Sequence, residues 1–213
     1  MWLGYAIALV AGYLLGSLPT GFLVARSRGI DLRTVGSGNI GATNAMRVLG
    51  KGPGLFVLLV DAAKGAVACL VGPWLAGLVG GDAGADWPRI AAGVGAILGH
   101  NFTCWLRFKG GKGVATSAGV LLVLMPAALG ICLAMWLAVV AASRIVSLAS
   151  IAAAITLPVA VWALDRSGPL QGVALALAVL AIHRHRSNIA RLLRGEEPRI
   201  GQGRAKAKEQ ASS

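Results

Sequence analysis

The chain has 213 residues, of which 56% are hydrophobic and 13% are charged. Soluble globular domains carry about 25% charged residues, so the long apolar runs predict a polytopic membrane protein with no room for a separate soluble domain of ordinary size. The net charge of +12 is typical of basic cytoplasmic loops. Because no basic helix or aromatic platform accompanies it, we expect no nucleic-acid partner.

The first apolar segment covers residues 3–25, and the first basic residues, Arg26 and Arg28, follow it. A cleaved signal peptide carries its positive charge before the apolar run. This order therefore predicts a retained first helix whose N-terminus lies outside the cell.

Six further apolar segments follow, at residues 54–79, 89–106, 114–125, 127–143, 147–164 and 169–183. Most basic residues lie in three of the intervening polar stretches, 26–53, 107–113 and the tail from 184. The stretches 80–88 and 165–168 carry few. Because cytoplasmic loops are enriched in Lys and Arg, we expect the first three inside and the last two outside.

Residues 114–143 decide the topology, because Pro126 interrupts them. One long tilted helix here, with five or six spans in all, would leave the basic tail outside. Two helices that fold back at Met125–Pro126, each shorter than the roughly 20 residues of a full span, keep the tail inside. We therefore predict an all-α polytopic membrane helical bundle with seven helical segments, its N-terminus out, its C-terminus in, and a partial-depth helix hairpin around 114–143.

Residues 1–200 are predicted to form a single integral membrane domain. Residues 201–213 are small, polar and basic, which is typical of a disordered cytoplasmic tail. The three cysteines lie in or beside apolar segments, and their spacing matches neither a CxxC pair nor a metal knuckle. We expect no metal site.

The first unusual polar stretch is 36–47, "GSGNIGATNAMR". Glycines let backbone N–H groups approach a ligand and form anion-binding nests, and Arg47 adds a guanidinium that grips phosphate or carboxylate. A flexible connector explains the same composition. The polar residues that accompany Arg47 are Ser37, Asn39, Thr43 and Asn44.

The second stretch is 108–117, "FKGGKGVATS", with a helix expected to begin near Gly113. The first N–H groups of a helix are unsatisfied and suit an anion, and Lys109 and Lys112 add charge. A Walker A loop reads GxxxxGK[ST] after a strand, whereas here a glycine follows Lys112. A nucleotide site is therefore not expected, and the lysines alternatively do no more than mark the cytoplasmic side.

The third stretch is 183–197, "HRHRSNIARLLRGEE", which reads as an interfacial helix. His185 and Asn188 are three residues apart, so they share one helical face and can address one ligand. A histidine in this position is more often an interfacial residue without a ligand. Within the second apolar segment, Asp61 and Lys64 have the spacing of a structural ion pair, and His100 stays unassigned.

All three stretches are expected on the same side of the membrane. They offer cations and glycines without a Ser-His-Asp order, a His/Cys metal spacing or an acidic cluster. This combination predicts a substrate that carries phosphate and, at the membrane interface, a lipid substrate.

Four segments, "GSLPTGFLVAR" (16–26), "DLRTVGSGNIGATNAMR" (31–47), "GHNFTCWLRFKGGKGVATSAG" (99–119) and "HRSNIARLLRGEE" (185–197), together resemble the bacterial acyl-phosphate:glycerol-3-phosphate acyltransferase family. The resemblance covers the chain except its tail. It implies a multi-pass protein of the bacterial cytoplasmic (inner) membrane with its active site on the cytoplasmic face. It implies transfer of a fatty acyl group from acyl phosphate to the 1-hydroxyl of glycerol 3-phosphate, the first acylation step of phospholipid synthesis, without a cofactor or a stable protein partner.

By matching motif, the resemblance implies a catalytic group of Ser37, His185 and Asn188. Arg47 and Lys109 or Lys112 are expected to bind phosphate; the choice between the lysines, and that between Glu196 and Glu197 as the acidic position of "RGEE", stay open. We expect direct transfer without an acyl-enzyme. The alternatives are a transporter for a phosphorylated solute and a CDP-alcohol phosphatidyltransferase. The full substrate-binding set is Arg47, Lys109, Lys112, Gly110, Gly111, Gly113, Asn39, Thr43 and Asn44.

Overall fold

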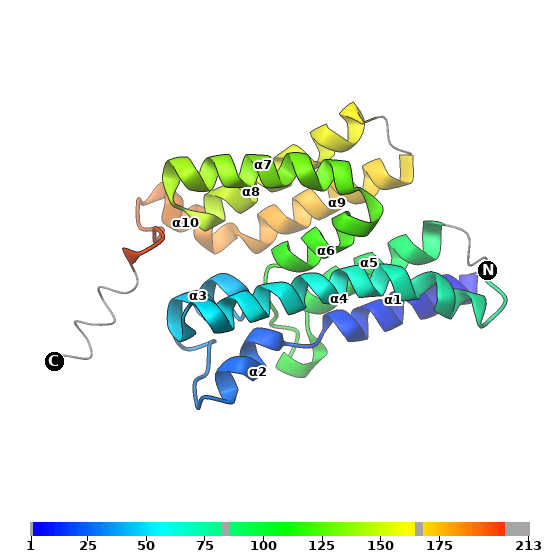
Figure 1. The fold of residues 1–213 in the computed structure, drawn as a ribbon, viewed down its shortest axis with the longest axis horizontal. Coiled ribbons are helices and arrows are strands. Elements are labelled where there is room, and N and C mark those ends of the chain that lie inside the picture. The colour runs from blue at the N-terminus through cyan, green and yellow to red at the C-terminus, as the bar shows by residue number, and fades with distance from the viewer. Residues whose placement is uncertain (1, 82–85, 165–167, 203–213) are drawn as a thin grey trace. The chain divides into compact units, whose positions relative to one another are not determined.

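A computed structural model describes residues 2–81, 86–164 and 168–202, and all regular structure within these ranges is helical (Figure 1). The chain divides into two compact units, Met1–Pro126 (unit 1) and Ala127–Ser213 (unit 2). Residues 82–85 and 165–167 of the two stretches predicted to lie outside, and residues 203–213 of the predicted tail, are not among the described residues.

Unit 1 is built around α4, a long apolar helix that packs against α1, α3, α5 and α6. Helix α1 also packs along α5. The elements in chain order are α1 (Trp2–Gly16), α2 (Thr20–Arg26), α3 (Ala42–Leu49), α4 (Lys51–Gly77), α5 (Asp86–Asn101), the 3-10 turn η1 (Cys104–Leu106) and α6 (Val114–Leu124).

Helices α1 and α5 touch backbone to backbone. A Cβ atom on Gly12 would lie 2.1 Å from the carbonyl oxygen of Ala92, and one on Gly99 would lie 2.1 Å from that of Tyr13. Small residues are the usual means of close helix packing in membranes. Glycines on both helices therefore set this crossing.

The first predicted segment, 3–25, is not one continuous helix. Helix α1 ends at Gly16 and α2 begins at Thr20. Pro19 lies in the break, where it has no N–H to continue the α-helical ladder. The Leu18 carbonyl lies in this interruption, where it accepts a hydrogen bond from the Lys64 side chain.

Unit 2 contains α7 (Pro126–Ser143), α8 (Val146–Ala163), α9 (Gly168–Arg184) and α10 (Arg186–Leu193). Helices α8 and α9 pack together, and α10 follows α9 after a single residue, His185. The Trp136 indole donates to the Ser150 hydroxyl at 3.3 Å, which ties α7 to α8.

In the described part of the chain, four stretches are long and apolar enough to cross a membrane: Trp2–Arg26, Lys51–Gly77, Pro126–Ser143 and Val146–Ala163. The helix break expected at Met125–Pro126 is present, since α6 ends at Leu124 and α7 begins at Pro126. At 11 residues, α6 measures about 16 Å, half of the roughly 30 Å hydrocarbon core. We expected both helices of the hairpin to be too short to span the membrane. This holds for α6 but is wrong for α7, which is long enough.

Candidate active site

Asn44 organises the first polar stretch. Its side chain is buried at the start of α3, and its Nδ2 donates to the carbonyls of Leu32, Val35 and Asn39 at 3.2, 3.1 and 2.9 Å. Its Oδ1 accepts the Ser37 N–H at 2.9 Å. One amide thus fixes four backbone groups, so the loop has a defined shape.

Ser37 lies exposed between two glycines with left-handed backbone, Gly36 (φ +62°) and Gly38 (φ +69°). That conformation favours glycine because other residues meet a steric penalty there. Asn39 shapes the same loop, since its Oδ1 accepts the Gly41 N–H at 2.9 Å. The loop therefore presents the Ser37 side chain on a backbone that its two asparagines hold.

Helix α3 carries the other two candidates of this stretch. Thr43 is exposed and Arg47 is half-buried; four residues apart, they share one helical face. Ahead of the loop, Arg33 forms an ion pair with Asp31 at 2.6 Å, and its guanidinium lies over the Phe22 ring. The hydrogen bond from Arg33 lowers the pKa of Asp31 to about 2.

The glycines of the second stretch pack against the end of α5. The N–H groups of Gly110 and Gly111 donate to the carbonyls of Asn101 and His100 at 3.2 and 3.0 Å. A Cβ atom on Gly110 would lie 2.1 Å from the His100 carbonyl oxygen. Gly113 has φ +78°, and a Cβ atom there would lie 2.6 Å from Asn101 Oδ1.

These contacts explain why the stretch contains glycines, which the sequence alone did not reveal. They allow the loop Lys109–Gly113 (the glycine loop) to lie directly on α5, and two of its N–H groups already donate to protein carbonyls. Lys109, which is exposed, and Lys112, which is half-buried, come shortly before the start of α6. The loop's positive charge therefore lies at a helix N-terminus, where the dipole also favours an anion.

His185 and Asn188 are both buried at the junction of α9 and α10 in unit 2. His185 Nδ1 lies 2.7 Å from the Ala181 carbonyl oxygen. A carbonyl only accepts hydrogen bonds, so this contact puts the hydrogen on Nδ1 and makes Nε2 the basic ring nitrogen. The His185 carbonyl accepts the Asn188 N–H at 2.8 Å, so both residues belong to one helical turn.

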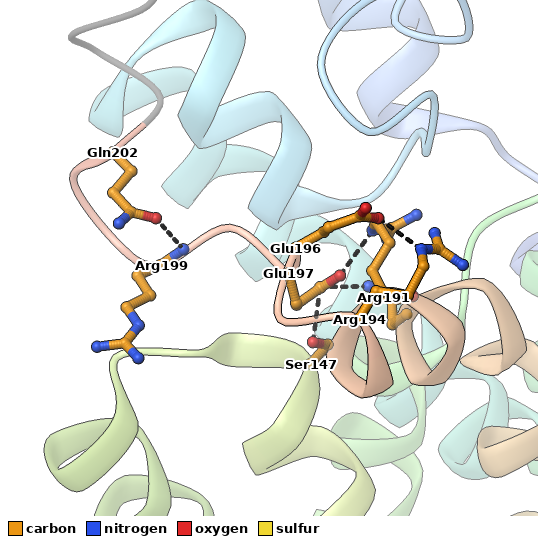
Figure 2. A network of polar contacts seen from close by, with 8 residues as sticks. Ser147, Arg191, Arg194, Glu196, Glu197, Arg199 and Gln202 are labelled. Atoms are coloured by element: carbon orange, nitrogen blue, oxygen red, sulfur yellow. Dashed lines mark hydrogen bonds and ion pairs between the residues drawn. The ribbon is translucent and has the colours of Figure 1, made fainter.

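Glu197 is the half-buried acidic residue of the third stretch, and its side chain alone is 7% exposed. It accepts hydrogen bonds from Ser147 and Arg191, both at 2.7 Å (Figure 2). It also accepts one from Asn188 at 2.5 Å. Burial raises the pKa of Glu197, but these hydrogen bonds and the Arg191 charge outweigh it, so its pKa lies below the ordinary value.

Glu196, by contrast, is exposed and pairs with Arg194 at 2.7 Å. Of the two acidic residues that the sequence left undecided, Glu197 is the one that contacts a candidate site residue, Asn188.

The predicted Asp61–Lys64 ion pair is confirmed, with 2.9 Å between Lys64 Nζ and Asp61 Oδ1. His100, which the sequence left unassigned, brings its Nδ1 to 3.6 Å from the same oxygen. No spacing rule relates residues 61 and 100, so this contact was not predictable from the sequence. Among the described residues, no three His, Cys, Asp or Glu side chains cluster as a metal site.

Comparison with known proteins identifies the family. A family model described as glycerol-3-phosphate acyltransferase matches residues 6–195. A Synechococcus sp. (strain JA-3-3Ab) protein of that name is 51% identical over 203 residues, covering 94% of this chain and 96% of the relative. A Desulforudis audaxviator protein of the same name is 48% identical over 199 residues, covering 92% and 96%.

The fold is also that of solved members. Crystal structures of PlsY, an integral membrane glycerol 3-phosphate acyltransferase, match in its glycerol 3-phosphate form (TM-score 0.84, 38% identity, 92% of this chain and 96% of that one) and in its lysophosphatidic acid form (TM-score 0.82, 36% identity, 92% and 95%). The chain therefore belongs to the glycerol-3-phosphate acyltransferase family.

Proposed function

We propose that this protein transfers a fatty acyl group from acyl phosphate to the 1-hydroxyl of glycerol 3-phosphate, giving lysophosphatidic acid and phosphate. The observation that carries the proposal is membership of the family over residues 6–195. One matched PlsY structure is a glycerol 3-phosphate form and the other a lysophosphatidic acid form. They support glycerol 3-phosphate as the acceptor and lysophosphatidic acid as the product.

Acyl phosphate is already activated, so the protein needs mainly to orient the acceptor and neutralise the leaving phosphate. In direct transfer, the acceptor oxygen attacks the acyl carbon, and the bond from that carbon to the phosphate oxygen breaks with its electron pair on the phosphate. The hydroxyl proton passes to His185 Nε2 or to the departing phosphate. Ser37 and Asn188 complete the catalytic group that the family resemblance implies.

The charges of Arg47 and of Lys112 or Lys109 bind the substrate phosphates. Thr43 lies beside Arg47 on α3 and supplies a further hydroxyl. Asn44 and Asn39 support this group by shaping the loop that carries Ser37. The glycines 110, 111 and 113 let the glycine loop lie on α5.

We further propose a multi-pass protein of the bacterial cytoplasmic membrane, formed by a single domain of seven helical segments over residues 1–200. The N-terminus is outside, the C-terminus inside, and the active site faces the cytoplasm. The concentration of basic residues in 26–53, 107–113 and the stretch from 184 supports this arrangement. Helix α6 forms the short limb of the hairpin around 114–143, and α7 the long one.

Purified protein in detergent, given acyl phosphate and glycerol 3-phosphate, is expected to release phosphate and lysophosphatidic acid in equal amounts. Acyl-CoA in place of acyl phosphate serves as the donor control and is expected to give no product. Absence of product with acyl phosphate, together with uptake of a phosphorylated solute into vesicles, would instead support the transporter alternative.

A further inference from the structure

A buried carboxylate, Asp61 of α4, lies at the centre of three ionisable side chains in unit 1. Asp61, Lys64 and His100 are 2%, 5% and 6% exposed. Lys64 Nζ lies 2.9 Å and His100 Nδ1 lies 3.6 Å from the same oxygen, Asp61 Oδ1. Charges in a helix long enough to span a membrane are costly, and they are usually paired or functional.

One arm of this cluster reaches the glycine loop through His100. The His100 carbonyl accepts the Gly111 N–H at 3.0 Å. Its ring lies directly beneath the same glycine, because a Cβ atom on Gly111 would come within 2.2 Å of His100 Nε2. The imidazole thus lies between the Asp61 carboxylate and the backbone that carries Lys109 and Lys112.

The other arm reaches the break between α1 and α2 through Lys64, whose Nζ donates to the Leu18 carbonyl at 3.0 Å. Helix α2, which starts two residues later, packs on the loop that carries Ser37. A Cβ atom on Gly21 would lie 1.9 Å from the Ile40 carbonyl oxygen. The same carboxylate is therefore linked to both polar stretches of unit 1.

We propose that Asp61 and His100 are positioning residues for the transfer reaction, a role that rests on the proposed function. Asp61 orients the His100 ring and the Lys64 ammonium, and these hold the glycine loop and the α1–α2 break where phosphate binding requires them. Neither side chain is assigned to the substrate. The competing explanation is charge balance alone, with Asp61 only a counter-ion for Lys64.

The double variant D61N/K64Q separates the two explanations, because it removes both charges and leaves no buried charge unpaired. The matched control is D86N/R89Q, which removes an ion pair with the same i,i+3 spacing between exposed Asp86 and half-buried Arg89 at the N-terminal end of α5. Positioning predicts that D61N/K64Q lowers kcat/KM by about tenfold or more and raises KM for at least one phosphorylated substrate. The control is expected to stay within about twofold of the wild type.

Charge balance alone predicts a D61N/K64Q protein with wild-type kcat/KM, and that result would overturn the proposal. A fall in kcat with both KM values unchanged, matched by a loss of folded protein in thermal unfolding, would overturn it too. Where the double variant does not fold, H100Q decides. It keeps the backbone bond to Gly111, loses the ring contact to Asp61, and is expected to show the same rise in KM.

In that case, kinetic constants of H100Q equal to those of the wild-type protein would overturn the proposal. Failure of the proposed function is distinguishable from either result, because the wild-type protein itself would then form no lysophosphatidic acid.

Discussion

At the scale of single residues, the two lysines of the glycine loop are distinguished by their surroundings. Lys112 is half-buried next to the start of α6, whereas Lys109 is exposed. We expect Arg47→Ala and Lys112→Ala each to lower kcat/KM by tenfold to a hundredfold, about the worth of a charge-assisted hydrogen bond, and Lys109→Ala to cost less. Steady-state kinetics measure this, with Lys51→Ala on the exposed start of α4 as control. Full turnover in both variants would contradict the phosphate-site proposal.

Asn44 is expected to matter for stability as well as activity. Its amide bonds four backbone groups, and buried groups left unpaired cost about 1–3 kcal/mol. We expect Asn44→Ala to lower the free energy of unfolding by roughly that amount, and Asn44→Asp as well, because a carboxylate cannot donate to three carbonyls. Thermal unfolding in detergent measures the loss. Ser27→Ala, which removes one exposed hydrogen bond, is the control, and an equal loss there would contradict the assignment.

The stability of unit 2 is expected to depend on pH through Glu197. Its pKa in the folded protein is lowered, so its contribution to stability is present above the unfolded value of about 4.3 and is lost as pH falls through the lower folded value. We expect Glu197→Gln to be less stable than the wild type at pH 7, with the gap closing under more acidic conditions. Glu196→Gln, at an exposed pair, should change little. A gap in melting temperature that is independent of pH would contradict this assignment.

At the scale of elements, the packing of α6 on α4 depends on glycine, which has no side chain to separate the two helices. A Cβ atom on Gly119 would lie 1.8 Å from the Ala62 carbonyl oxygen, whereas one on Gly130 of α7 would meet nothing within 4 Å. We therefore expect Gly119→Ala to force the helices apart at a cost of about 1–3 kcal/mol, and to impair activity because α6 follows the glycine loop. Gly130→Ala should be neutral or slightly stabilising. Thermal unfolding of the two variants tests the contrast, and equal behaviour would refute it.

The same elements show what the sequence does and does not encode locally. Apolar runs and the Pro126 interruption predict where helices lie and where α6 ends, because length and proline act locally. The meaning of Gly110 and Gly111 is not local, since it depends on the end of α5 lying beneath them. The structural role of Asn44 is not local either, because nothing in its neighbours shows that the loop bends back onto its amide.

At the scale of the whole molecule, the predicted family and helical class are confirmed, because four ordered motifs and long apolar runs are properties of the entire sequence. The link from Asp61 to His100 was missed, since it joins residues 39 positions apart on different helices. The orientation in the membrane stays a prediction from the distribution of charge.

Reporter fusions test that orientation at two decisive points. With a hairpin around 114–143, both Arg144 and the C-terminus lie inside, so a fluorescent protein that matures only in the cytoplasm should be bright after either residue 144 or residue 213. One long tilted helix would place both outside, where a periplasmic phosphatase fusion is active instead. Fusions after Lys51 and after Gly80 calibrate the assay, because both topologies place the first inside and the second outside. Phosphatase activity after residue 213 would overturn the hairpin, and with it the explanation of why α6, at 11 residues, is shorter than a spanning helix.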